Sequence, residues 1–132
     1  MIEAGVVIDT DGKPIHWHLP PGRSGGSLPD SRELWTIIWE NRDRISGFAH
    51  THPWNGDAWP SGTDITTFEA IEAALGRELS WWVVTLDQVA LIRRDHDTHG
   101  PPYQWGVHKL RANEPEPAWV DRLRELSRGS TP

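Results

Sequence analysis

The sequence predicts a single mixed α/β domain (α+β), in which a mixed β-sheet is flanked by helices. The chain has 132 residues, which is the length of one ordinary domain. Segments with the two-residue period of strands alternate along the chain with segments of helical period. No internal repeat and no linker divides the sequence, so we treat residues 1–132 as one domain.

The N-terminal part of the chain is predicted to form a β-hairpin. An apolar strand over residues 2–10 and an alternating strand over residues 14–19 flank the dipeptide Asp11-Gly12, which is a strong turn signal. Because side chains alternate across a strand, the second strand should present one polar face to solvent. We expect two histidines on that solvent face, His16 and His18.

Two helices and three strands are predicted after the hairpin. A loop rich in Pro, Gly and Ser covers residues 20–29, and a helix should begin at Asp30 or Ser31. Glu33 stands three residues after Asp30, as in a capping box. The remaining elements are strands over residues 45–51, 81–86 and 89–92, a helix over 64–75 that stops at Gly76, and a short helix over 118–126, with residues 93–117 unassigned.

Composition restricts the classes of partner and cofactor. The formal net charge is −6, which disfavours nucleic acid as a partner, because phosphate binding needs clustered Lys and Arg. No apolar run approaches the roughly 20 residues that span a bilayer, and no signal peptide is visible, so we expect a cytoplasmic protein without membrane contact. The chain has no cysteine, so any transition metal would be held by histidines and carboxylates.

Two histidines at the end of a predicted strand indicate a metal site. His50 and His52 are two residues apart, so both imidazoles leave the same face of the strand, and Pro53 then ends it. A hydrolytic zinc site needs a third protein ligand and leaves the fourth position to water. Asp64 suits this role, because it opens the next helix and the intervening loop can fold it back onto the histidines.

Simpler interpretations of the same residues stay open. Ser61 and Asp64 also match a capping box, so they could merely start the helix. Two further polar groups compete as metal sites, although both are more typical of solvated surface. These are the hairpin pair His16 and His18 and the cluster Asp95, His96, Asp97 and His99.

The joint spacing resembles the signature of the JAMM metalloproteases, the active branch of the MPN domains. The chain reads His-Thr-His-Pro, then seven residues, Ser, two residues and Asp, over residues 50–64. The resemblance covers about residues 3–92 and leaves residues 93–132 as a variable C-terminal extension. It implies an MPN-like fold, related to that of cytidine deaminases, with one Zn²⁺ per chain held by His50, His52 and Asp64.

The same resemblance assigns two catalytic roles. Ser61 matches the serine that helps to stabilise the oxyanion, and Glu3 is the best match to the glutamate of the first strand that acts as general base. Glu33 and Glu40 are the rivals for the base, but both lie in the helix before the histidine strand. The family usually has a helix before the glutamate strand, whereas this chain begins almost at that strand, so how Glu3 is anchored stays open.

The function that the resemblance implies is amide hydrolysis by a zinc metallopeptidase or isopeptidase. The substrate would be the C-terminal tail of a ubiquitin-like or sulfur-carrier protein, and the small size looks prokaryotic or phage-like. The alternatives are an inactive MPN-type protein-binding scaffold and a metal-dependent amidohydrolase with a small-molecule substrate. Two tryptophans between the metal ligands, Trp54 and Trp59, either pack under their loop or line a substrate groove.

Overall fold

The computed structural model describes residues 2–97 and 104–129 and has a six-stranded mixed sheet with three helices. The sheet order is β2-β1-β3-β4-β5-β6, and only the β3–β4 pair is parallel. This confirms the mixed α/β class. The elements are β1 (Gly5–Asp9), β2 (Pro14–His18), α1 (Arg32–Glu40), β3 (Ile45–Thr51), α2 (Gly62–Leu75), β4 (Ser80–Val84), β5 (Val89–Asp95), β6 (Gln104–Lys109) and α3 (Val120–Ser127).

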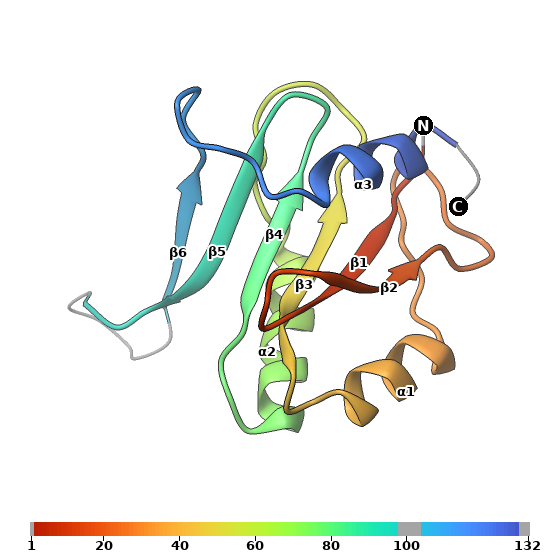
Figure 1. Ribbon diagram of the computed structural model, residues 1–132, viewed down its shortest axis with the longest axis vertical. Helices are drawn as coiled ribbons and strands as arrows, with labels where there is room; N and C mark the ends of the chain where they lie inside the picture. Colours follow the sequence, from red (N-terminus) through yellow and green to blue (C-terminus); the bar gives the residue numbers. More distant parts are fainter. Residues whose placement is uncertain (1, 98–103, 130–132) are drawn as a thin grey trace.

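Helices cover both faces of the sheet. Residues of α1 and α2 pack with Val7, Trp81 and Val83 on one face, whereas α3 packs with Val6 and Val84 on the other. Figure 1 shows α3 crossing one face near the ends of the strands, with α2 behind the opposite face. Because Val6 and Val7 belong to different cores, the alternation of β1 follows the two-residue period of a strand. Within the described residues, no helix combines the length and apolarity that crossing a membrane requires.

The central strand β3 coincides with its predicted range and touches its neighbour β4 very closely. A Cβ built on Gly47 would lie 1.6 Å from the carbonyl oxygen of Ser80. Only glycine therefore permits this approach of the parallel strands β3 and β4. The helix α2 connects them as a crossover and ends at Gly76, which has the expected left-handed conformation (φ 70°).

Both helix starts differ slightly from the prediction. Ser31 caps α1, and its Oγ accepts a hydrogen bond from Leu34 N at 3.0 Å, so the capping box expected between Asp30 and Glu33 does not form. Asp30 instead accepts a hydrogen bond from the Trp35 side chain at 2.6 Å. The second helix begins at residue 62, two residues before the predicted start, because Ser61 supplies the N-cap.

One strand escaped the sequence analysis. β6 lies within residues 93–117, which were left unassigned, and β5 continues three residues beyond its predicted end at residue 92. The segment is polar, so it lacks the apolar alternation by which a strand is predicted from sequence. Contacts of a charged side chain instead join the end of β5 to the start of β6. The guanidinium of Arg94 lies 4.0 Å from the centre of the Trp105 ring and also pairs with Glu72 at 2.9 Å.

The prediction of a solvent-facing histidine pair on β2 is wrong for His18. This side chain is only 3% exposed, and its Nε2 lies 2.7 Å from the carbonyl oxygen of Pro29. The loop over residues 20–29 passes over this face of β2 and covers it. Burial, partly offset by the contact with Pro29, lowers the pKa of His18 and keeps it neutral at pH 7.

Candidate metal centre

His50, in β3, and His52, one residue beyond its end, point to the same side of the sheet, as the sequence predicts. His50 and His52 are both buried, and their Nε2 atoms lie 3.2 Å apart. Residues of the same parity on β3 face the α1–α2 side of the sheet, whereas Ala49 packs in the core beneath α3. The strand period therefore converges both imidazoles on one point.

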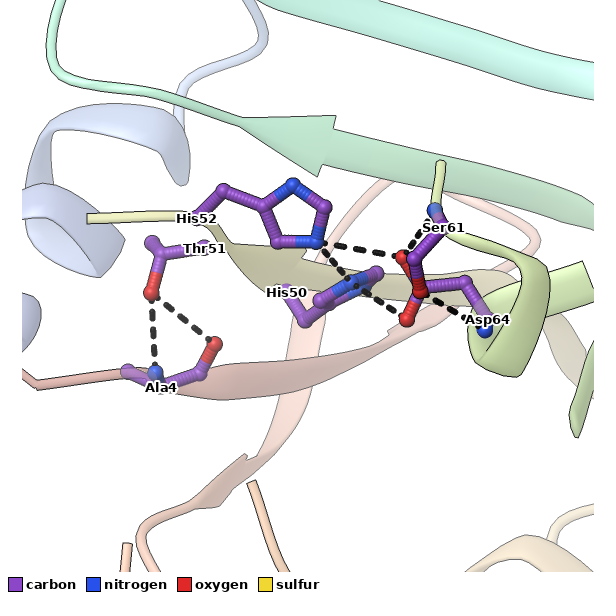
Figure 2. Close-up of polar contacts among 6 residues, drawn as sticks. All are labelled: Ala4, His50, Thr51, His52, Ser61 and Asp64. Carbon is purple, nitrogen blue, oxygen red and sulfur yellow. Dashed lines mark hydrogen bonds and ion pairs between the residues drawn. The ribbon is translucent and has the colours of Figure 1, made fainter. Parts of the chain in front are cut away.

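Asp64 meets both histidines from the first turn of α2. Its Oδ1 lies 3.2 Å from the Nε2 of His50, and its Oδ2 lies 3.1 Å from the Nε2 of His52 (Figure 2). The capping box of α2 fixes the carboxylate, because Ser61 N donates to Oδ2 at 2.8 Å while Ser61 Oγ accepts from Asp64 N at 3.1 Å. The helix cap and the site are thus the same residues, so the two interpretations of Ser61 and Asp64 are compatible.

Glu3 joins the histidines from the segment just before β1. Glu3, His50 and His52 each offer a ligand atom, and these atoms lie within 4.8 Å of one another, so the group could hold a metal ion. Gly5 pairs with His50 across the β1–β3 ladder, which sets Glu3 two residues further along on the same face. The rival glutamates, Glu33 and Glu40, are exposed on α1.

The distances among His50, His52 and Asp64 are those of hydrogen bonds and are also close to the spacing of zinc ligands. A tetrahedral zinc ion with bonds of about 2.0–2.1 Å sets its ligand atoms about 3.3–3.4 Å apart. The three contacts among His50, His52 and Asp64 measure 3.1–3.2 Å, close to that spacing. Asp64 contacts both imidazoles directly, and Glu3 offers a ligand atom within 4.8 Å of theirs, so both carboxylates lie within reach of an ion held by the two histidines.

The surroundings of the two carboxylates shift their pKa values in opposite directions. Burial alone would raise the pKa of Asp64, but contacts with His50, His52 and the backbone of Ser61 outweigh it and hold that pKa far below its usual range. Burial raises the pKa of Glu3, although both histidines oppose the shift. A permanently ionised carboxylate suits a metal ligand, and one with a raised pKa suits a proton acceptor.

One atom of the site lacks a protein partner. His52 Nδ1 is buried and has no hydrogen-bond partner among the described residues. The ring of Trp54 lies against this imidazole, with 4.6 Å between the ring centres. An unpaired buried polar atom costs about 1–3 kcal/mol. Unpaired buried polar atoms of this kind are found at functional sites, and here the ring is oriented by the contacts of its Nε2 atom and not by those of Nδ1.

The C-terminal helix α3 anchors the segment that carries Glu3. Ser127, at the end of α3, donates from its Oγ to the Ile2 carbonyl at 2.6 Å and accepts from Ile2 N through its own carbonyl at 2.9 Å. Its Oγ also lies 3.0 Å from Thr51 Oγ1, which accepts from Ala4 N at 2.9 Å. Both residues that flank Glu3 are therefore clamped between β3 and α3, and Figure 2 shows Thr51 pointing toward Ala4.

The two loop tryptophans lie differently. Trp54 is 47% exposed and touches the metal centre through His52. Trp59 is 57% exposed and has Lys109 Nζ 5.2 Å from its ring centre. Only Trp54 is among the residues that line the cavity next to the site.

A cavity of about 520 Å³ adjoins the metal centre, and we call it the helix-side cavity. Glu3, His50, His52 and Asp64 line one part of it. The rest lies between the sheet, α1 and α2. Its apolar lining includes Leu34, Ile38, Phe48, Phe68, Ile71 and Trp81, and the loop before α1 adds Leu28 and Pro29.

The competing polar groups do not form a comparable site. His16 and His18 have ring centres 6.5 Å apart, and His18 is engaged by the Pro29 carbonyl. His96 is exposed and pairs with Glu78 at 2.8 Å, while His99 lies outside the described residues. Among the described residues, the only candidate metal cluster is the one at Glu3.

Sequence reasoning missed the residues that hold Glu3, because Ser127 and Thr51 carry no motif and meet only in the fold. No family model and no curated protein matches this sequence.

Proposed function

We propose that this protein is a zinc-dependent amide hydrolase of the JAMM type, built on an MPN-like domain. The observation that supports the proposal is the convergence of Glu3, His50, His52 and Asp64 on one buried point. These residues come from three separate parts of the chain. The motif spacing predicts His50, His52 and Asp64, and the JAMM resemblance adds Glu3. A structural role alone would not require four basic or acidic groups to face one another.

The donor set suits zinc. His50 and His52 would bind through Nε2 and Asp64 through a carboxylate oxygen, which leaves the fourth position open for a hydrolytic reaction. A bound zinc ion would act as a Lewis acid and make water a stronger nucleophile at neutral pH. The absence of cysteine agrees with this donor set.

The remaining residues supply proton transfer and polarisation. Glu3, with its raised pKa, accepts a proton from the attacking water and passes it to the leaving amine. Ser61 uses its oxygen to cap α2, so its hydroxyl hydrogen can still donate to the carbonyl oxygen of the substrate. Loss of one such donor commonly costs about 2.7–4 kcal/mol of transition-state stabilisation.

The JAMM resemblance suggests a peptide or isopeptide bond after the tail of a ubiquitin-like or sulfur-carrier protein. The exposed ring of Trp54 beside His52 supports a surface along which an extended tail can lie. A second candidate is a small-molecule amide. The partly enclosed helix-side cavity favours it, since an open groove alone would suffice for a protein tail.

The test compares wild type, Glu3→Gln and Glu33→Gln, each loaded with zinc. The substrates are a ubiquitin-like protein fused through its tail to a reporter and a mixture of short peptide amides. Glu3→Gln should retain zinc and lose about 10²–10⁴-fold in turnover, because it loses the general base. Glu33→Gln, on exposed α1, is the matched control and should match wild type. Near-normal turnover by Glu3→Gln, or no hydrolysis by wild type, contradicts the proposal.

A further inference from the structure

The helix-side cavity is larger than packing defects usually are. Protein interiors are close-packed, and voids larger than a water molecule are few. A cavity of about 520 Å³ falls in the range of about 300–1,000 Å³ that is typical of small-ligand sites. The cavity is partly open to solvent, so it is a surface pocket that a ligand can enter and not an internal packing void.

The walls of the cavity are apolar and flat. Phe68 and Trp81 stack on each other with their ring centres 4.3 Å apart and are at most 2% exposed, so they form the floor of the cavity. The partly exposed apolar side chains of the lining include Leu28 and Phe48. Phe48 from β3 and Ile38 from α1 line the same space. Flat aromatic and branched aliphatic walls bind rings and branched chains, whereas a glycine-rich tail would leave them uncovered.

Charge excludes one class of occupant. Among the described residues that line the cavity, none is Lys or Arg, and three are acidic. Two of these, Glu3 and Asp64, belong to the metal centre. The third, Asp30, is directed into hydrogen bonds with Ser31 N and the Trp35 side chain. The apolar part therefore offers no partner for a carboxylate or phosphate, and burying an unpaired anion there would be costly.

The cavity begins at the metal centre itself. The ring of His50 meets the ring of Phe68 edge-on, with 6.4 Å between their centres. A substrate whose carbonyl lies at the nitrogen end of His50 has a side chain within reach of Phe68. The metal centre and the apolar walls thus form one continuous binding site.

We propose that the helix-side cavity binds a bulky apolar group of the substrate, aromatic or branched aliphatic, attached next to the scissile carbonyl. This inference rests on the proposed function for the carbonyl and on the cavity for the apolar group. It makes the substrate an uncharged apolar acyl compound or a peptide with a large apolar residue before the cleaved bond, and it disfavours a plain Gly-Gly tail.

The first experiment tests the cavity without metal. Phenylacetamide and acetamide are titrated into metal-free protein while the methyl resonances of Ile38 and Ile71 are followed by NMR. Phenylacetamide should shift these resonances and acetamide should not, because only the former carries a ring. No shift with either compound overturns the proposal, whatever the metal centre does.

The second experiment joins the cavity to the metal centre. Calorimetry compares phenylacetohydroxamate with acetohydroxamate on zinc-loaded protein, because both share the chelating group. The phenyl compound should bind about ten- to hundredfold more tightly, as expected for burial of one aromatic ring. Equal affinities overturn the proposal. If the chain retains no zinc, the proposed function fails, while the NMR result still decides the cavity.

A pair of variants on α2 completes the design. Thr67 is exposed and lines the cavity, so it lies at the rim, whereas its neighbour Thr66 is exposed and does not line it. Thr67→Trp should remove the advantage of the phenyl compound and leave acetohydroxamate binding intact. Thr66→Trp should change neither affinity. A phenyl preference that survives Thr67→Trp contradicts the assignment of the ring to this cavity.

Discussion

Removal of one buried hydroxyl, in Ser127→Ala, should reduce turnover although Ser127 lies on the opposite face of the sheet from the candidate site. Ser127 Oγ bonds the Ile2 carbonyl at 2.6 Å and lies 3.0 Å from Thr51 Oγ1, so the change leaves both without this partner. Ser127 is buried, so water cannot easily replace it. The penalty for such groups is about 1–3 kcal/mol, and at this chain length each kcal/mol lowers Tm by about 3–5 °C.

The effect on turnover should exceed the effect on stability. Ile2 directly precedes Glu3, and misplacement of a catalytic group by about 1 Å can cost on the order of 10²-fold. We therefore expect kcat to fall about ten- to hundredfold at temperatures where the variant is fully folded. The zinc content should stay unchanged, because His50, His52 and Asp64 do not touch Ser127.

Ser46→Ala is the matched control for this prediction. Ser46 Oγ likewise donates to a backbone carbonyl, that of Ile8 at 3.3 Å, but Ile8 lies near the end of β1 that is far from Glu3. It should lower Tm modestly and leave kcat unchanged. The assays are thermal unfolding and turnover at one temperature below both transitions. Equal losses of kcat in both variants would refute the idea that Ser127 acts by positioning Glu3.

Two further predictions concern the rim of the site and its pH dependence. Trp54→Ala should reduce turnover several-fold with little change in Tm, whereas Trp59→Ala should leave turnover intact, because only Trp54 contacts His52; equal effects on turnover would argue against this difference. Burial lowers the pKa of His18 below the value of about 6.5 expected in the unfolded chain. The unfolded state therefore binds a proton more readily, and the free energy of unfolding should fall as pH drops from about 7 to about 5.5. Urea unfolding should show a weaker pH dependence for His18→Gln, and an identical dependence would count against this cause.

The local periodicity of the sequence was enough to predict most of the fold and the two histidines at the core of the site. The two-residue spacing of His50 and His52 on an apolar strand was enough to place both imidazoles on one face, and β3 occupies its predicted range. The helix start next to Ser61 was equally local, since capping depends on adjacent backbone groups. Glu3 was predicted to belong with these residues, and it does lie beside both histidines.

The wrong or missing predictions concern residues whose structure depends on contacts with segments distant in the sequence. His18 has the alternation of an exposed position, but Pro29, eleven residues further along the chain, lies over it and contacts its ring. β6 has no continuous apolar pattern and is recruited by pairing with β5. The contact of Ser127 with residues 2 and 51 spans nearly the whole chain, so no local pattern could indicate it.

The most direct test of the proposed metal centre is the zinc content of purified variants, measured by elemental analysis after exposure to excess zinc and desalting. We expect wild type, Glu3→Gln and His96→Ala to retain one zinc per chain, and His52→Ala and Asp64→Asn to lose most of it. The geometry supports this order, because both Asp64 oxygens lie 3.1–3.2 Å from the imidazole nitrogens. Wild-type protein without stoichiometric zinc, or full zinc in His52→Ala, would contradict the account, and loss of zinc in Glu3→Gln but not in Asp64→Asn would exchange the roles of the two carboxylates.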